Sequence, residues 1–211
     1  MANNLIVSFE DIGYSNEVII AKLFLEIKKS GIYHIVGRNG IGKSTFFKVL
    51  NGELKYKQAT VTLDSQEINI QKNTKIIKID NNFYGYEFLT SFEYIIYILR
   101  VFNCYASQKK RKIQLLLEIL NMSEFSTTLI KELSEGTKQK LSFVITLLLE
   151  GDILLFDESF EHIDIESNEK IIELLMKETE KIIFIISHTN SLKIKYDGVI
   201  NFEEMIDDKN I

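Results

Sequence analysis

Apolar residues along the chain fall into short runs that are typical of strands, and stretches with helical spacing lie between them. The runs that predict strands are residues 5–9, 18–27, 31–36, 60–63, 75–79, 152–156 and 182–186. Helical spacing is found at residues 46–50, 92–120, 133–150 and 167–178. Apolar strands that end in polar residues and alternate with helices indicate an α/β fold, with a parallel sheet that binds its ligand at the carboxyl ends of the strands.

The middle of the chain predicts a helical insertion. Residues 92–120 include an amphipathic stripe formed by Ile113, Leu116, Leu117 and Leu120. The helix expected at residues 133–150 begins after Ser134, a good N-cap. Its first turn holds Glu135, where a carboxylate suits the helix dipole.

Length, charge and cysteine content narrow the classes of function. The 211 residues, 45% of them apolar, can bury a substantial core and leave no room for a second full domain. An excess of carboxylates, 30 against 25 Lys and Arg, gives no general attraction for nucleic acid, so we expect none as a partner. One cysteine and the lack of a signal peptide predict a cytosolic chain. The apolar runs are shorter than the ~20 residues that span a bilayer, so work at a membrane would need a partner.

A glycine-rich loop stands between the strand at residues 31–36 and the following helix. It matches the phosphate-loop (Walker A) pattern G-x-x-x-x-G-K-[ST], whose glycines let backbone N–H groups point at phosphate oxygens. In that frame Lys43 reaches the β- and γ-phosphates, Ser44 ligates magnesium and Thr45 is placed for the α-phosphate. The alternative interpretation is a flexible glycine-rich turn with a surface lysine. The strand before the loop and the helix after it favour the phosphate loop instead. The residues expected to bind nucleotide here are Gly37, Arg38, Asn39, Gly40, Gly42, Lys43, Ser44 and Thr45.

The apolar run at residues 153–156 has the form of a Walker B strand. It ends in Asp157 and Glu158. Asp157 is expected to hold the magnesium ion through water, and Glu158 to act as the base that takes a proton from the attacking water. With Lys43, Glu158 is therefore an expected catalytic residue.

Histidine supplies one further candidate for catalysis. His188 follows the apolar strand at residues 182–186 and is expected to contact the γ-phosphate and the attacking water. The other two histidines lie inside an apolar strand, His34, and in a polar loop, His162, so we expect no catalytic role for them.

Residues 133–141, with the sequence L-S-E-G-T-K-Q-K-L, resemble the signature L-S-G-G-Q of ABC-type ATPases and its basic helix. Ser134 stands 23 positions before Asp157 (157 − 134), a spacing similar to that of the family. The resemblance to the nucleotide-binding domain of these ATPases covers essentially the whole chain. It implies a single domain over residues 1–211 with the P-loop NTPase fold of ABC type. That fold has a mostly parallel core sheet, an N-terminal antiparallel β subdomain and a helical subdomain at about residues 85–150.

The resemblance also implies roles for residues outside the phosphate loop. Ser134 and Gly136 would contact the γ-phosphate held by a second copy. Tyr14 looks like the aromatic residue that stacks on adenine. Asn81 stands where the family has the Gln that links magnesium to the membrane subunit. Asp164 matches the aspartate of the loop that crosses the dimer interface.

Four positions depart from the family pattern. Glu135 and Thr137 replace the first Gly and the Gln of the signature, Asn81 replaces Gln, and Ser159 replaces the usual Pro. None of these changes removes a group that does chemistry. Asn is one methylene shorter than Gln but keeps the amide, so the change bears on metal contact and coupling rather than on hydrolysis. The side chain of Glu135, in the first turn of a helix, is expected to point outward.

The function that the resemblance implies is that of an ATP-binding and ATP-hydrolysing subunit of an ABC transporter, with ATP and Mg²⁺ as ligands. Two copies, or this chain and a close homologue, would close head to tail around two ATP molecules. They would move a polytopic membrane subunit from the cytoplasmic, inner face of the cell membrane. The signature variant, followed by Lys-Gln-Lys, looks more like that of exporters, so we expect export. The aromatic residues Phe83, Tyr84, Tyr86 and Phe88 are expected either to contact that partner or to belong to the core.

Two alternatives stay open. The first is a soluble ABC ATPase that acts on nucleic acid or ribosomes, although the length excludes the paired domains or long coiled-coil insertion that such members usually carry. The second is a nucleotide-binding module that does not hydrolyse ATP. The intact Lys43, Asp157, Glu158 and His188 argue against this second alternative, while the altered signature keeps it open.

Overall fold

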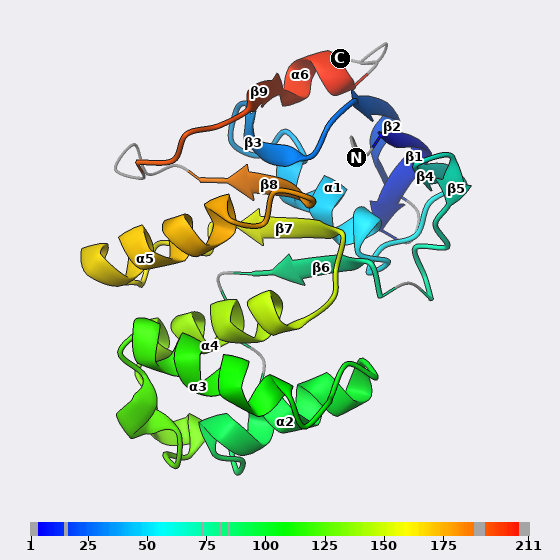
Figure 1. Ribbon diagram of the computed structural model, residues 1–211. Helices are drawn as coiled ribbons and strands as arrows, with labels where there is room; N and C mark the ends of the chain where they lie inside the picture. The colour runs from blue at the N-terminus through cyan, green and yellow to red at the C-terminus, as the bar shows by residue number, and fades with distance from the viewer. Residues whose placement is uncertain are drawn as a thin grey trace.

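The structure is a computed structural model that describes residues 4–14, 17–72, 74–80, 82–83, 85–187 and 193–206 (Figure 1). Its strands are β1 (Leu5–Tyr14), β2 (Glu17–Ile27), β3 (Gly31–Val36), β4 (Gln58–Leu63), β5 (Gln66–Glu67), β6 (Ile76–Ile79), β7 (Ile153–Asp157), β8 (Ile182–Ile186) and β9 (Gly198–Asn201). Its helices are α1 (Lys43–Leu50), α2 (Ser91–Val101), α3 (Lys109–Ile119), η1 (Ser123–Phe125), η2 (Ile130–Glu132), α4 (Glu135–Leu148), α5 (Ile165–Met176) and α6 (Phe202–Met205).

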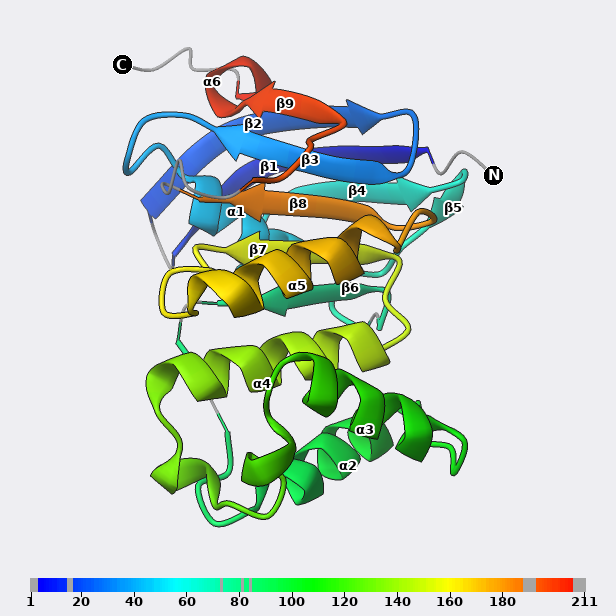
Figure 2. The same cartoon turned by 60° about the vertical axis from the view of Figure 1, so that its left-hand side comes forward.

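The described strands form two sheets (Figure 2). One is parallel, with the order β6-β7-β8-β3-β9, and the other is antiparallel, with the order β2-β1-β4-β5. In the parallel sheet Ile182 pairs with both Gly31 and Ile153, so the strands that precede the phosphate loop and Glu158 run side by side with β8. The carboxyl ends of these strands therefore meet at one edge, and the predicted α/β fold with a parallel core is confirmed.

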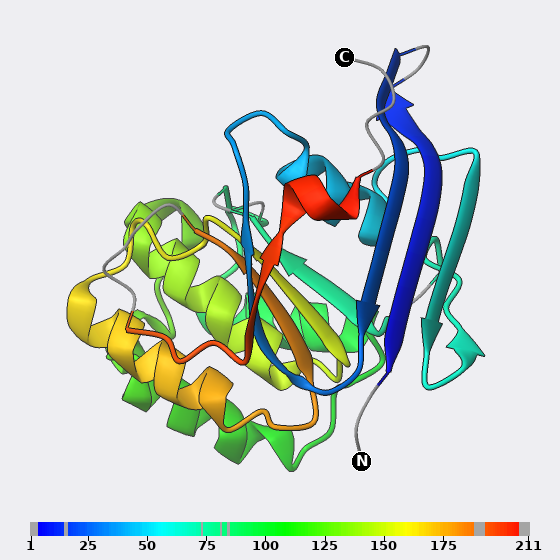
Figure 3. The ribbon, with the colours of Figure 1, turned by 90° about the horizontal axis from the view of Figure 1, so that it is seen from above.

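Helix α1 lies between the two sheets, which Figure 3 shows from above. Its side chains Phe46, Phe47, Val49 and Leu50 are fully buried in one apolar cluster with residues of both sheets. Burying an apolar side chain of this size contributes about 1.5–3 kcal/mol, so this cluster fixes the phosphate loop at the amino end of α1 against the sheets.

The other face of the parallel sheet is covered by α4 and α5, with α2 and α3 packed beyond α4 (Figures 1 and 2). Phe143 of α4 stacks on Phe156 of β7, with ring centroids 5.1 Å apart. This contact joins the helix that begins at the signature residues to the strand that carries Asp157.

The helical stretch expected at residues 92–120 is divided into two helices. Helix α2 ends because Asn103 takes a left-handed backbone conformation, with φ of 54°, and the Cys104 N–H then donates to the Leu99 carbonyl at 2.7 Å. This arrangement satisfies the last carbonyls of a helix, and Asn tolerates the conformation better than most residues do. Sequence periodicity does not show it, because apolar spacing resumes in α3.

Five short elements, β5, η1, η2, β9 and α6, were not expected from the sequence. Each is two to four residues long, too short for a periodic pattern to develop. Two expected site residues, Asn81 and His188, lie outside the described residues, as does Tyr84.

Candidate nucleotide-binding site

The loop between β3 and α1 has the backbone that a phosphate cradle requires. Gly42, at the N-cap of α1, has a φ of 111°, and Gly40 has a φ of 78° with open space where a Cβ would lie. Both conformations favour glycine. On the other side of the loop, Gly37 packs against Phe202 of α6, where an added Cβ would come within 3.2 Å of its side chain. The short C-terminal helix therefore supports the loop from behind.

Lys43 is a buried cation, with 7% of its surface exposed. Its Nζ donates hydrogen bonds to the carbonyls of Gly37 at 2.7 Å and Arg38 at 2.9 Å. Among the described residues no carboxylate lies within ion-pair distance of it. Because a buried charge is costly without a counter-charge, this ammonium is suited to receive an anion such as a phosphate oxygen.

Ser44 and Asp157 come together from different elements, α1 and β7. The Ser44 Oγ donates to the Asp157 Oδ1 at 3.0 Å. A hydroxyl and a carboxylate are oxygen ligands of the kind that Mg²⁺ prefers, so this pair fits a magnesium ion bound beside phosphates. Burial raises the pKa of Asp157 above its ordinary value, although the hydrogen bond from Ser44 works in the opposite direction.

Two adjoining cavities extend from this pair, and they share Ser44 and Glu158. The first, of about 430 Å³, is lined by Asn39, Gly40, Gly42, Lys43, Ser44, Thr45, Glu158 and Ile186. The second, of about 460 Å³, is lined by Ser44, Lys48, Glu53, Asp80, Asn82, Asp157 and Glu158. The phosphate loop and the end of the Walker B strand thus face the same space.

Glu158 stands in a backbone conformation that is unfavourable for its side chain. Its φ is 52°, which costs a residue other than glycine about 1–3 kcal/mol. Its N–H donates to the Ile186 carbonyl at 2.9 Å, and this bond to the neighbouring strand β8 helps to hold the conformation. Glu158 lines both cavities.

Ser159, which departs from the family pattern, has a structural role. Its hydroxyl is fully buried and donates to the carbonyls of Ile79 at 2.9 Å and Asp157 at 3.3 Å. It therefore ties the end of β7 to the end of β6, which a proline could not do.

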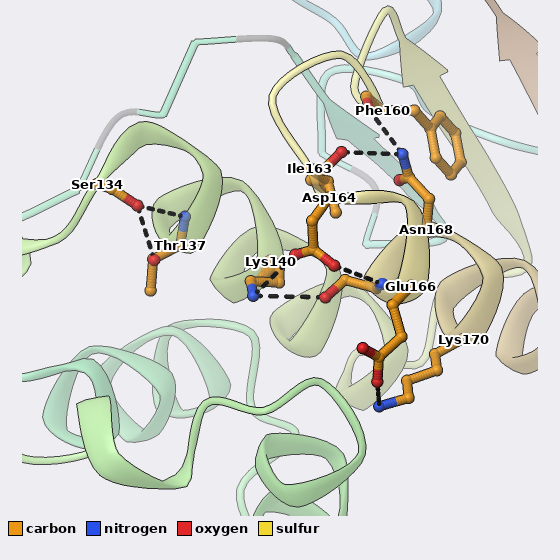
Figure 4. Close-up of polar contacts among 10 residues, drawn as sticks. Ser134, Thr137, Lys140, Phe160, Ile163, Asp164, Glu166, Asn168 and Lys170 are labelled. Carbon is orange, nitrogen blue, oxygen red and sulfur yellow. Dashed lines mark hydrogen bonds and ion pairs between the residues drawn. The ribbon is translucent and has the colours of Figure 1, made fainter. Parts of the chain in front are cut away.

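The signature residues begin α4 and are held by hydrogen bonds at its first turn (Figure 4). The Ser134 Oγ accepts from the Thr137 N–H at 3.2 Å, and the two hydroxyls lie 2.8 Å apart. Thr137, which replaces the family Gln, therefore helps to orient the Ser134 hydroxyl. Glu135 is exposed and pairs with Lys138 at 2.9 Å, in keeping with the outward direction expected for it.

Asp164 caps α5 and links it to α4 (Figure 4). Its carboxylate accepts from the Ser167 N–H at 2.8 Å and lies 3.4 Å from the Lys140 Nζ. Partial burial raises the pKa of Asp164, but the Ser167 hydrogen bonds and the Lys140 charge outweigh it and lower the pKa below its ordinary value. Gly136 lies against the same loop, where an added Cβ would overlap the His162 carbonyl. The signature helix and the loop after β7 therefore form one packed unit.

The structure brings together only part of the expected site. The phosphate-loop residues meet Asp157 and Glu158, whereas Ser134, Gly136 and Asp164 line neither cavity. Arg38 is exposed and pairs with Glu203 of α6 at 3.4 Å. Tyr14 is 46% exposed at the end of β1 and also lies outside the lining of both cavities.

Sequence reasoning missed two buried polar residues near the site. Gln139 of α4 is 1% exposed and donates to the Asp80 carbonyl at 3.0 Å, just before Asn81. Lys78 of β6 has a side chain that is 1% exposed and pairs with two carboxylates. For Lys78 the available signal was a charged residue within an otherwise apolar run, whereas Gln139, between Lys138 and Lys140, gave no such signal.

Asp157→Asn is expected to raise the melting temperature of the nucleotide-free protein at neutral pH. A carboxylate whose pKa is raised on folding destabilises the folded state where it must ionise, and the amide removes that cost. The gain should be about 2–4 °C for each kcal/mol, and it should vanish as the pH falls below the unfolded-state pKa, where the carboxyl is protonated in both states.

The measurement is thermal unfolding of both proteins across a pH series. Asp152→Asn, at a more exposed carboxylate that pairs with Lys75, serves as the matched control and should give no such gain. A lower melting temperature for Asp157→Asn at neutral pH would contradict the assignment of a buried, destabilising carboxylate.

None of the helices within the described parts of the chain has the length and apolar character to cross a membrane.

Comparison with known proteins identifies the family. The family model described as "ABC transporter" matches residues 20–161. The methionine import ATP-binding protein MetN of Campylobacter jejuni is 34% identical over 188 residues, which cover 78% of this chain and 56% of that protein. The energy-coupling factor transporter ATP-binding protein EcfA of Aster yellows witches'-broom phytoplasma is 26% identical over 193 residues, which cover 89% of this chain and 71% of that protein.

A solved structure shares the fold. The putative ABC transporter ATP-binding protein from Pyrococcus furiosus superposes with a TM-score of 0.78 at 21% identity, and covers 97% of this chain and 100% of its own. Across three curated relatives, MetN of C. jejuni among them, this chain spans 42–61% of the relative's length. From the family match and the phosphate loop described above, we conclude that the chain belongs to the ABC transporter family, as an ATP-binding subunit.

Proposed function

We propose that this chain binds Mg²⁺ and ATP between the phosphate loop and the end of β7 and hydrolyses the ATP to drive transport. The observation that carries the proposal is the meeting of Ser44 with Asp157 at 3.0 Å, next to the buried Lys43 and to Glu158. A cation for phosphate, a pair of oxygen ligands for a metal ion and a carboxylate for water are the groups that phosphoryl transfer to water uses.

The chain's own residues divide the work of hydrolysis. Lys43 binds the β- and γ-phosphates and neutralises their charge as it shifts toward the leaving ADP. Ser44 and Asp157 hold the magnesium ion, which supplies further charge neutralisation when bound. Glu158 orients a water and takes its proton as the water oxygen bonds to the γ-phosphorus and the bond to ADP breaks. His188, just after β8, is proposed to contact the γ-phosphate.

A second copy completes the site in this proposal. Ser134, Gly136 and Asp164 line neither cavity of their own chain, so they are available for the nucleotide of a partner subunit. The N-terminus of α4 is a favourable place for a γ-phosphate because of its unpaired N–H groups and its dipole. Two chains would therefore close head to tail, with Tyr14 and Arg38 placed at the base and phosphate ends of the nucleotide.

We further propose that a helical subdomain at about residues 85–150 carries the contact with a membrane subunit. A largely apolar cavity of about 250 Å³ lies between β6 and helices α2 and α4, and Phe83 and Tyr94 are among its lining residues. Tyr86, 58% exposed, packs against Tyr97, which in turn stacks on the lining residue Tyr94. Phe88, two residues further along the chain, is 79% exposed. Exposed aromatic residues beside an apolar hollow suit an apolar segment of a partner protein.

Tyr86→Ser combined with Phe88→Ser is expected to abolish recovery of a membrane subunit without changing ATP affinity. The experiment is a pull-down of tagged protein with Mg-ATP from detergent-solubilised host membranes, read by mass spectrometry. Leu115→Ser, which removes a 53% exposed apolar side chain from α3, is the matched control and should recover the subunit. If neither the parent nor the control recovers a polytopic membrane protein, the result would contradict the transport proposal. It would favour the alternative of a soluble ABC ATPase.

The direction of transport is proposed to be import. Of the two curated relatives named above, one is named as a methionine import ATP-binding protein and the other as an energy-coupling factor transporter ATP-binding protein. The export expected from the signature variant has no counterpart in these names. The membrane subunit recovered in the pull-down, once reconstituted in vesicles with ATP on one known side, gives the direction by the side on which substrate accumulates.

A further inference from the structure

Lys78 is a buried cation in the middle of an apolar edge strand, β6. Its neighbours Ile77 and Ile79 face the core that contains α4, while Lys78 lies on the opposite face, the side of α1. The side chain is 1% exposed, so the part of the residue that solvent reaches is its backbone, at the edge of the sheet. A lysine in this position is rare because burying an ammonium is costly unless the charge is paired.

The charge is paired twice. The Lys78 Nζ lies 2.8 Å and 3.1 Å from the two carboxylate oxygens of Glu53, and 2.9 Å from the Asp80 Oδ1. Glu53 follows the C-terminal end of α1, and Asp80 follows β6. Burial works against protonation of Lys78, but these two carboxylates outweigh it and raise the pKa of Lys78 above its ordinary value. The lysine is therefore a fixed positive charge between two elements of the site.

Both partners of Lys78 belong to the wall of the proposed metal site. Glu53 and Asp80 line the same cavity of about 460 Å³ as Ser44, Asp157 and Glu158. Without Lys78, four carboxylates and one other cation, Lys48, would line this space, and Glu53 would keep a hydrogen bond from the Asn51 amide at 2.9 Å. Carboxylate oxygens that are not otherwise engaged compete for a divalent cation, and each added negative charge strengthens its binding.

We propose that Lys78 is a positioning residue of the magnesium site, which occupies Glu53 and Asp80 so that the metal comes with ATP to Asp157 rather than to these two carboxylates. The proposal rests on the proposed function and adds to it a reason why the site prefers the metal–nucleotide complex over the free cation. A lysine that only tied β6 to α1 would affect stability and leave cation binding unchanged.

The test is Lys78→Met, which keeps the length of the side chain and removes its charge. Electron paramagnetic resonance of Mn²⁺, used as the probe for Mg²⁺, measures free and bound cation with and without ATP. The variant is expected to bind Mn²⁺ without nucleotide at least about tenfold more tightly than the parent protein. Lys75→Met, at the residue just before the same strand and paired with Asp152 at 3.5 Å, is the matched control and should bind Mn²⁺ like the parent.

A second set of variants separates charge from folding. Restoring the balance in Lys78→Met/Glu53→Gln/Asp80→Asn should return nucleotide-free Mn²⁺ binding to the level of the parent. Glu53→Gln/Asp80→Asn with Lys78 kept should weaken Mn²⁺ binding in the presence of ATP, because an unbalanced ammonium then faces the metal site.

Lys78→Met that binds Mn²⁺ without nucleotide as weakly as the parent would overturn the proposal. If Lys78→Met does not fold, the test passes to Glu53→Gln/Asp80→Asn, and Mn²⁺ binding with ATP equal to that of the parent would then overturn it. A parent protein that gives no ATP-dependent Mn²⁺ signal would instead count against the proposed function, while the nucleotide-free comparison would still decide the role of Lys78.

Discussion

Lys43→Ala is expected to weaken ATP binding by at least about 30-fold. Lys43 is 7% exposed and, in the described part of the chain, donates only to the carbonyls of Gly37 and Arg38, so a phosphate would provide the counter-charge that the ammonium lacks. Loss of one partner of a buried, charged hydrogen bond costs about 2–5 kcal/mol, which weakens binding by about 30-fold to several thousand-fold. Isothermal titration calorimetry with Mg-ATP measures the change.

The control for this variant is Lys57→Ala. Lys57 is an exposed lysine just before β4 that pairs with Asp11 at 3.4 Å. This control removes the same charge from the chain and should leave ATP affinity as it is. Unchanged ATP affinity in Lys43→Ala would refute the assignment of the phosphate loop.

Glu158→Gln is expected to keep ATP binding and lose turnover. The amide has the shape of the carboxylate and can still position a water, but it cannot take a proton. Loss of a general base lowers the rate by about 10²–10⁴-fold. The left-handed backbone at Glu158, held by the N–H bond to Ile186 at 2.9 Å, should be unaffected because it does not involve the side chain.

The measurement for Glu158→Gln is single-turnover release of phosphate, together with ATP affinity from calorimetry. Glu161→Gln, an exposed glutamate three residues further along the same loop, is the control and should hydrolyse ATP at the rate of the parent. Hydrolysis by Glu158→Gln within about tenfold of the parent rate would assign the base to another residue.

The phosphate loop and the strands beside it could be predicted because their signals are local. A glycine pattern fixes the loop. The runs of β3, apolar apart from His34, and of β8, wholly apolar, begin and end at the residues expected from the sequence. The N-cap role of Ser134 is likewise a property of one turn, and the structure confirms it. Parallel order then follows from the alternation of strands and helices.

Long-range features could not be predicted in the same way. Phe202 supports the phosphate loop from a helix more than 150 positions later in the chain, and no local sequence pattern predicts that contact. In the sequence Lys78 only interrupts an apolar strand. Its ion pairs with Glu53 and Asp80 form when the chain folds, so they could not be predicted. The break between α2 and α3 depends on one left-handed asparagine, Asn103, which the apolar spacing on both sides conceals.

The departures from the family signature gain a physical interpretation from the structure. Thr137 hydrogen-bonds to Ser134 through both its N–H and its hydroxyl, so the replacement of Gln keeps the Ser134 side chain ordered. Glu135 pairs with Lys138 away from the start of the helix. These contacts are compatible with a signature that works on a partner's nucleotide, which remains a prediction.

Multi-angle light scattering of Glu158→Gln protein, with and without Mg-ATP, tests the central claim most directly. An ATP-dependent dimer of this variant requires nucleotide binding at Lys43, a stalled hydrolysis step and the signature residues of a second copy at the same time. We predict the mass of one chain without nucleotide and of two chains at saturating Mg-ATP, with the shift lost when Lys43→Ala is added. A mass that stays the same with and without ATP would contradict the account.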